Sequence, residues 1–150
     1  MKIQIVTLFP EMVEGFFENS IMRRAVQSGF VEYEIIDFRR FATDKHQSCD
    51  DVPYGGGAGM VIKADPLCKA LSSIEAQSKR VVYASPSGKR FTQQYAEILS
   101  KEDELVFICG HYEGIDQRVI DLYVDDEISI GDYVISSGEV STLVIVDAVY

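Results

Sequence analysis

This sequence contains only three cysteines, and neither a long apolar run nor a recognisable secretion signal is found in it. Its three cysteines (Cys49, Cys68 and Cys109) are odd in number and widely spaced, and they form no Cys-x-x-Cys pair. A disulfide framework is therefore not expected, and a reducing cytoplasmic location fits. No apolar run approaches the roughly 18 residues of a membrane span, so no membrane partner is expected. The apolar N-terminus has no cleavage site and continues into Pro10 and Glu11, which favours a first strand over a signal peptide.

Basic side chains are scarce in the last third of the chain. Residues 1–100 carry 12 basic and 12 acidic groups, whereas residues 101–150 carry two basic and 12 acidic groups and so hold the whole net charge of −10. Because phosphate neutralisation supplies much of the affinity for nucleic acids, charge alone disfavours such a partner. Three short basic pairs remain as candidates for phosphate contacts: Arg23/Arg24, Arg39/Arg40 and Lys45/His46.

Strand and helix patterns alternate, which predicts a single α/β domain with a mostly parallel sheet flanked by helices. Strands are expected at Lys2–Phe9, Val31–Asp37, Arg80–Ala84, Leu105–Cys109, and near 126–130 and 133–136. Helices are expected from Pro10, through Ile21–Val26 up to Gly29, from an Asp65 cap with Pro66 as first residue, from a Thr92 cap, and after Asp116.

The last segment, Val140–Tyr150, fits two structures. Its Val, Ile and Thr content favours a strand, while its length and its position after Gly138 allow a helix. The sequence also stops inside this apolar segment without a polar tail. We therefore expect a truncated chain.

Two segments punctuated by glycine are the main candidates for a ligand site. Residues 110–116 (GHYEGID) directly follow the strand Leu105–Cys109, and residues 129–139 (SIGDYVISSGE) follow the short strand near 126–130. Loops at the carboxyl ends of parallel strands are where open α/β folds bind ligands. These segments therefore predict a small polar ligand held largely by backbone groups. Residues 85–88 (SPSG) form a predicted turn at the end of another strand.

A third segment, residues 50–60 (DDVPYGGGAGM), has four glycines in five positions. It lacks the Gly-Lys-Ser/Thr of a Walker A loop and the Gly-x-Gly-x-x-Gly spacing of a dinucleotide site. It is either a surface loop or a backbone-lined surface beside a base or phosphate, where missing side chains allow close approach.

His111 is the candidate for acid–base chemistry in these loops, because histidine titrates near neutrality. No Ser or Cys near it resembles an activated nucleophile, and a Cys109–His111 pair has no further ligands at metal-site spacing. We therefore expect no metal site and favour a position beside the ligand. Glu113, Asp116, Asp132 and Glu139 can instead be solvated loop charges or helix caps, and the position of Asp116 favours the start of a helix.

Together, these motifs resemble the N-terminal domain of the bacterial tRNA (guanine-N1-)-methyltransferase family. The matching motifs stand in order along essentially the whole chain: Leu8–Met12, Asp50-Asp51, Pro53–Gly57, Gly59-Met60, Ser85-Pro86, Tyr112–Asp116, Arg118–Ile120 and Ser129–Val134. The resemblance implies a SPOUT-type fold with a C-terminal trefoil knot, one of the rare exceptions to unknotted chains. It further implies methyl transfer from S-adenosylmethionine to N1 of the guanosine 3′ of the anticodon in tRNA. A homodimer with its site at the subunit interface is also implied.

The resemblance assigns site residues as well. Cofactor contacts fall on Tyr83, Ala84, Ser85, Pro86, Gly110, Tyr112, Glu113, Ser129, Ile130, Gly131, Asp132, Tyr133, Val134, Ile135 and Gly138. Substrate contacts fall on Asp50, Gly55, Gly56, Gly57 and Gly59, and Glu113 is a further candidate on the substrate side. The family's catalytic Arg and Asp fall directly after Tyr150 and in the interdomain segment, so no catalytic residue is expected within the chain. Residues 1–150 would thus be the cofactor-binding catalytic domain, with the C-terminal tRNA-binding domain absent.

Four positions depart from the family pattern: His111 replaces Arg, Ser137 replaces Gly, Ser141 replaces Pro and Ala58 replaces Pro. Ser137 would weaken cofactor binding if its position needs a positive φ, but its hydroxyl can donate a hydrogen bond, and we expect binding to survive. Two other classes remain open. One is an α/β protein that binds a nucleoside phosphate through the same loops, and the other is a non-catalytic dimerisation module in which the loops are structural.

Overall fold

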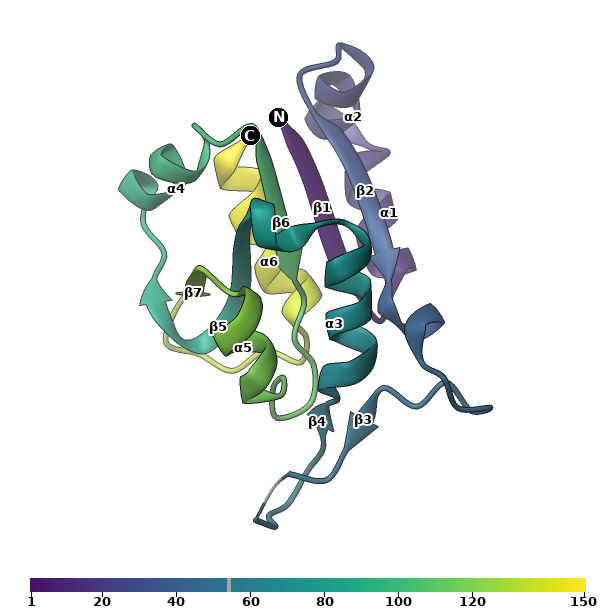
Figure 1. Cartoon of the computed structure of the whole chain (residues 1–150). Helices are drawn as coiled ribbons and strands as arrows, with labels where there is room; N and C mark the ends of the chain where they lie inside the picture. The colour runs from purple at the N-terminus through teal and green to yellow at the C-terminus, as the bar shows by residue number, and fades with distance from the viewer. Residues whose placement is uncertain (54) are drawn as a thin grey trace.

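A five-stranded parallel sheet organises the molecule. The computed structural model describes residues 1–53 and 55–150, so Tyr54 of the glycine-rich segment lies outside the described residues. The strands lie in the order β2-β1-β6-β5-β7, and each neighbouring pair is parallel. A short antiparallel pair, β3 and β4, projects beyond the carboxyl edge of this sheet (Figure 1). The predicted α/β fold with a mostly parallel sheet is confirmed.

The elements have the following bounds. The strands are β1 (Lys2–Thr7), β2 (Glu32–Asp37), β3 (Asp50–Asp51), β4 (Val61–Ile62), β5 (Arg80–Arg90), β6 (Glu104–Ile108) and β7 (Asp126–Ser129). The α-helices are α1 (Pro10–Phe17), α2 (Ser20–Gln27), α3 (Ala64–Ser73), α4 (Gln93–Leu99), α5 (Gln117–Tyr123) and α6 (Gly138–Val149). Short 3-10 helices span Phe38–Phe41 and Ala76–Ser78.

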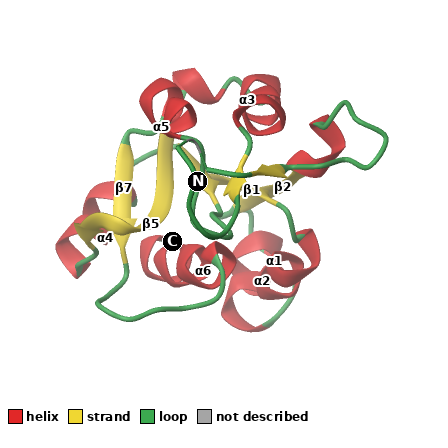
Figure 2. Cartoon of the chain, turned by 90° about the horizontal axis from the view of Figure 1, so that it is seen from below, coloured by secondary structure: helices red, strands yellow, loops and turns green. Residues whose placement is uncertain are grey.

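Helices cover both faces of the sheet, with α3 and α5 on one face and α1, α2, α4 and α6 on the other (Figure 2). The sequence of β6 shows why. Leu105 and Phe107 pack into the layer that contains α6, whereas Val106 and Ile108 pack into the layer that contains α3. All four side chains are fully buried. A strand covered on both faces carries an unbroken apolar run, which is the signal that the sequence shows here.

The prediction of a strand at 133–136 is wrong. Residues 130–137 form an irregular segment between β7 and α6, and Val134 within it is fully exposed. The Tyr-Val-Ile content favours a strand only where side chains pack against neighbouring strands. This segment instead leaves the sheet edge and crosses toward the end of β6, where the N–H of Gly138 donates to the carbonyl of Gly110.

The predicted turn at 85–88 lies inside β5, which is longer than expected. Ala84 and Lys89 both pair with Ile128, so that the four residues between them form a bulge. A Cβ on Gly88 would lie 2.4 Å from the backbone of Glu127, so this position has no room for a side chain. The bulge carries Ser85 and Pro86 away from the regular ladder at the carboxyl edge.

Two predicted helix caps are confirmed. Thr92 accepts a hydrogen bond from the N–H of Tyr95 at 3.2 Å, and Asp116 accepts one from the N–H of Arg118 at 2.9 Å. Pro10 also begins α1 as predicted. These signals succeed because capping depends on side chains within one turn of the helix.

The start of α3 is predicted wrongly by two residues. The helix begins at Ala64, with Lys63 as its N-cap, so Asp65 lies inside the first turn. Its negative charge still favours the helix there, because the first turn carries the positive end of the helix dipole.

The last segment of the chain is a helix. In α6, Ile145, Val146 and Val149 are buried against the sheet at helical spacing. Among the described residues, no helix has the length and apolar character needed to span a membrane.

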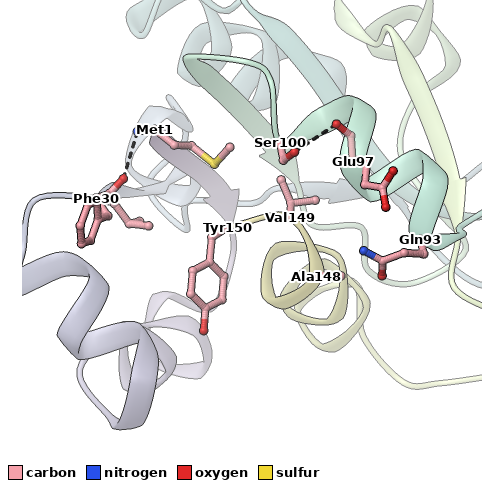
Figure 3. A pocket seen from close by; sticks show the side chains of 9 residues that line it. Met1, Phe30, Gln93, Glu97, Ser100, Ala148, Val149 and Tyr150 are labelled. Atoms are coloured by element: carbon pink, nitrogen blue, oxygen red, sulfur yellow. Dashed lines mark hydrogen bonds between the residues drawn. The ribbon is translucent and has the colours of Figure 1, made fainter.

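Both chain ends lie at the amino edge of the sheet (Figure 1). A hollow of about 460 Å³ opens there between Met1, Phe30, Glu97 and Tyr150 (Figure 3). Each of the nine residues that line this hollow lies outside the set predicted for the ligand site. The loops predicted to bind ligands belong to the opposite, carboxyl edge.

Candidate functional site

Three loops at the carboxyl edge of the sheet surround a cavity of about 350 Å³. They are the bulge of β5 (85–88), the loop after β6 (109–116) and the segment between β7 and α6 (130–137). This volume lies within the range of small-molecule sites. Fourteen of the fifteen predicted cofactor positions line the cavity: Tyr83, Ala84, Ser85, Pro86, Gly110, Tyr112, Glu113, Ser129, Ile130, Gly131, Tyr133, Val134, Ile135 and Gly138. Asp132 is not among the lining residues.

Two glycines allow these loops to meet. The N–H of Gly138 donates to the carbonyl of Gly110 at 2.8 Å, and a Cβ on Gly138 would lie 2.4 Å from the Gly110 nitrogen. A Cβ on Gly110 would in turn lie 2.9 Å from the ring of Tyr83. Because backbone atoms cannot yield as side chains do, α6 begins directly against the loop after β6 only if residue 138 is glycine.

Tyr83 forms a buried wall of the cavity and is 4% exposed. Burial raises the pKa of Tyr83 to about 12, and the negative charge of Glu127 adds to the rise, while a backbone hydrogen bond with Ile115 opposes it. The phenol is therefore neutral at physiological pH. It offers a ligand an aromatic face without a charge.

Two polar atoms beside the cavity are buried and have no hydrogen-bond partner among the residues that the structure describes: Nδ1 of His111 and Oγ of Ser137. The His111 ring is held in place by Phe9, at 5.0 Å between centroids, and by Tyr112, at 4.7 Å. Buried polar groups usually have partners, so unpaired ones at a cavity wall suit a polar ligand. His111 thus lies beside the cavity, and its expected position beside a bound ligand stays a prediction.

Ser137 does not strain the backbone, since its φ of −151° is in the extended region. The loss of binding that a positive φ would have caused is therefore not expected at this position. Ser137 is the N-cap residue of α6, but its side chain makes no cap hydrogen bond. The hydroxyl of Ser141 donates to the carbonyl of Gly138 at 2.9 Å, within the first turn of the same helix. Both serines that depart from the family pattern are accommodated.

Glu139 lies in the first turn of α6 and is only 1% exposed, so its interpretation as a solvated charge is wrong. Its Oε1 accepts a hydrogen bond from the Thr7 hydroxyl at 2.7 Å. Burial raises the pKa of the Cys109 thiol, and the charge of Glu139 adds to that rise. A carboxylate is favourable at a helix N-terminus. The hydrogen bond between Thr7 and Glu139 therefore links β1 to α6.

The residues predicted to contact the substrate lie outside the cavity, in the glycine loop (residues 55–60) and in β3. Residues 55–57 are exposed, and no described residue comes within 4 Å of a Cβ built on any of them. Gly59 and Asp50 approach the cavity: a Cβ on Gly59 would lie 2.5 Å from Cγ of Glu113, and Asp50 lies near the phenol of Tyr112. Burial raises the pKa of Tyr112, and the charge of Asp50 raises it further. The residues predicted to contact the substrate therefore approach those predicted to contact the cofactor at Glu113 and Tyr112.

Seven lining residues were not among the predicted cofactor positions: Ser87, His111, Gly114, Ile128, Ser136, Ser137 and Ser141. Most of them lie in the same three loops as the predicted positions, so including every residue of each loop would have predicted them. Ser141 follows Gly138 by about one helical turn, which places both residues on one side of α6. In residues 1–53 and 55–150, no group of three or more His, Cys, Asp or Glu side chains could hold a metal ion.

The family model described as tRNA (Guanine-1)-methyltransferase TrmD matches residues 1–150. The chain belongs to this family. The resemblance drawn from the motifs is therefore confirmed.

Several similar proteins bear the name tRNA (guanine-N(1)-)-methyltransferase. The protein from Borrelia duttonii is 61% identical over all 150 residues, which cover 62% of that relative. The Treponema denticola protein is 59% identical over the whole chain, which covers 62% of it. The Treponema pallidum protein is 57% identical over 99% of this chain and 60% of its own length. The chain thus spans about three fifths of the length of these tRNA (guanine-N(1)-)-methyltransferases.

Proposed function

We propose that these 150 residues bind S-adenosylmethionine as part of a tRNA (guanine-N1-)-methyltransferase, which transfers the methyl group to N1 of the guanosine 3′ of the anticodon. The observation that carries the proposal is the cavity at the carboxyl edge in a chain of this family. Membership of a methyltransferase family requires a methyl donor, and fourteen of the fifteen positions assigned to it line one cavity.

The cavity suits this cofactor in its chemistry. Tyr83, Pro86 and Ile130 supply apolar surface for an adenine ring, and glycines such as Gly110 let the backbone approach the ligand closely. The unpartnered Oγ of Ser137 can donate a hydrogen bond to a ribose or carboxylate oxygen. When bound there, the cofactor supplies a methyl group activated by a sulfonium.

Guanine N1 carries a proton, which sets what the site must do. A base must accept this proton as the N1–CH₃ bond forms and the CH₃–S bond breaks. A donor near O6 would stabilise the negative charge that develops on guanine. The family pattern gives these roles to an Asp and an Arg outside residues 1–150, while Asp50 and Glu113 lie on the substrate side within the chain. We therefore expect the 150 residues alone to bind cofactor but to methylate tRNA little or not at all.

The proposal includes a homodimer with the site at the subunit interface. Tyr133 and Val134 in the segment before α6, and Val140 and Val144 on α6, are exposed by 60%, 100%, 46% and 47%. Exposed apolar surface of this kind is typical of protein interfaces. A second copy would cover it beside the cavity. The acidic last third then serves the cofactor and the dimer, so most cations for tRNA would lie elsewhere in the molecule.

The proposal also includes the trefoil knot. The segment from residue 130 to residue 137 leaves the sheet edge at β7, and Gly138 is bonded to Gly110 at the end of β6. This return across the sheet is the feature that supports a threaded chain.

A thermal-shift panel tests the proposed ligand class. S-adenosylmethionine and S-adenosylhomocysteine should each raise the melting temperature, because a ligand at 100 times its Kd stabilises a protein by about 2.7 kcal/mol. ATP and GTP should give no comparable shift. A preference for the nucleoside triphosphates would favour the nucleotide-binding alternative, and no response to any ligand would favour the dimerisation module.

A further inference from the structure

The glycine loop and the loop after β6 are joined along a short parallel pairing. Ile62 in β4 bridges to Ile115, and both side chains are buried. The N–H of Glu113 donates to the carbonyl of Met60, and the N–H of Ile62 donates to the carbonyl of Gly114, each at 3.0 Å. The candidate substrate loop and the candidate cofactor loop are therefore parts of one hydrogen-bonded unit.

Within this unit, Gly59 packs directly against the side chain of Glu113. A Cβ on Gly59 would lie 2.5 Å from Cγ and 2.7 Å from Oε1 of Glu113. The Glu113 side chain is exposed, so an added methyl group would displace that side chain rather than unfold the loop. Gly56 offers a comparison. Both glycines have a positive φ, 95° at Gly59 and 81° at Gly56, but no atom of the described residues lies within 4 Å of a Cβ on Gly56.

We propose that Gly59 is a positioning residue that couples the two loops. Because Gly59 has no side chain, the Glu113 side chain can pack against it and stay at the wall of the cofactor cavity. The backbone hydrogen bonds of Met60 and Ile62 then transmit the effect of a ligand bound in that cavity to the glycine loop. The inference rests on the proposed function.

The coupling has a simple physical cause. Glu113 and Gly114 line the cavity, so a bound ligand restricts them. Their backbone bonds to Met60 and Ile62 then restrict the base of the glycine loop as well. Coupling of this kind is reciprocal, so a change in the loop that displaces Glu113 must weaken cofactor binding.

Hydrogen exchange on the 150-residue chain tests the transmission. Saturation with S-adenosylhomocysteine should slow exchange at Ile62 and in the glycine loop by about fivefold or more. Helix α2, on the other face of the sheet, serves as the unaffected reference. Protection confined to residues 110–114, with the glycine loop unchanged, would overturn the coupling.

Matched glycine variants test the role of Gly59. G59A and G56A should lose similar thermal stability, because each places a side chain at a positive φ. Only G59A should weaken S-adenosylhomocysteine, by about fivefold or more in a calorimetric titration. In an E113A background, G59A should weaken it no further. Equal effects of G56A and G59A on affinity, or a full G59A effect in E113A, would contradict a positioning role.

The outcomes also separate this inference from the proposed function. Failure of the wild-type chain to bind S-adenosylhomocysteine would overturn both. Binding in the cavity without protection of the glycine loop would overturn the coupling alone.

Discussion

Two adjacent residues at the start of α6, Ser137 and Gly138, differ in whether their position has room for a side chain. Ser137 carries a side chain in an extended backbone conformation, whereas Gly138 has the backbone of Gly110 in the place where a side chain would lie. The requirement at residue 138 comes from a second loop and not from its own φ. Single positions of this kind determine how closely the loops around the cavity approach one another.

Replacement of Gly138 by Ala should therefore destabilise the protein. The added Cβ would lie 2.4 Å from the Gly110 nitrogen, and separating two backbones should cost about 1–3 kcal/mol of unfolding free energy. Urea denaturation measures this cost. Gly15→Ala is the control, because Gly15 lies within α1 and no described residue comes within 4 Å of its Cβ position. This change should be neutral or stabilising. Equal midpoints for Gly138→Ala and wild type would contradict the close contact.

For single residues, the family pattern groups the assigned positions correctly around one cavity but does not describe the packing beneath them. The family pattern places fourteen of fifteen assigned positions on one cavity, because motif spacing preserves loop geometry. It does not show that Glu139 is buried and bonded to Thr7, since those residues are 132 positions apart and meet only through packing. The extended φ of Ser137 is likewise set by the loops and not by local residue types.

Secondary-structure elements at the β7 edge are held together by one ionic network. The Arg80 side chain in β5 donates to Asp126 in β7 at 2.7 Å and to Glu102 at 2.9 Å, and the Tyr95 hydroxyl in α4 also donates to Asp126. Burial alone would raise the pKa of Asp126, but the hydrogen bonds from Arg80 and Tyr95 outweigh it and leave the pKa below its usual value. The ionised form of Asp126 therefore stabilises the fold.

Asp126→Asn should lower the unfolding free energy by about 1–3 kcal/mol near neutral pH, because Arg80 and Tyr95 lose a charged acceptor. The folded-state pKa is depressed, so this stabilisation is fully present above the unfolded pKa of about 4 and is lost as the pH falls through the folded value. Denaturation of both proteins across this pH range measures the difference. A gap between variant and wild type that persists unchanged at pH 2 would contradict the account. Glu102→Gln is the control and should cost less, since Glu102 is more exposed.

Elements buried on both faces are the ones that the sequence predicts well. The apolar run Leu105–Cys109 predicts a buried strand, and the corresponding strand β6 occupies the centre of the sheet. Residues 133–136 have similar residue types but lie outside the sheet, because no local signal distinguishes a strand from an apolar loop around a cavity. The choice between strand and helix for the last segment likewise depended on packing of Ile145 and Val149 against the sheet.

Exposed apolar side chains occur on several elements of the molecule, and one group of them lies on α6 and in the segment before it. Val140 and Val144 are half exposed on α6, beside the loop that carries Val134. Such a surface is consistent with the proposed homodimer, and it lies next to the cavity and not at the hollow of the amino edge.

The double variant V140D/V144D should convert the proposed dimer into a monomer, because two carboxylates would be desolvated in the interface. Sedimentation velocity measures the change. Leu122→Asp is the control, since Leu122 on α5 is 60% exposed on the opposite face of the sheet, and this variant should remain dimeric. A wild-type chain that sediments as a monomer at every concentration would remove the homodimer from the proposal.

Calorimetric titration of S-adenosylhomocysteine measures whether the cavity at the carboxyl edge binds the methyl donor. The wild-type chain should bind one molecule in the cavity at the carboxyl edge. Ile135→Arg, which adds a long cation to the cavity lining, should abolish binding, while Leu122→Arg on the far face should leave it unchanged. Absence of binding by the wild-type chain, or unaltered binding by Ile135→Arg, would contradict the assignment of this cavity to the methyl donor.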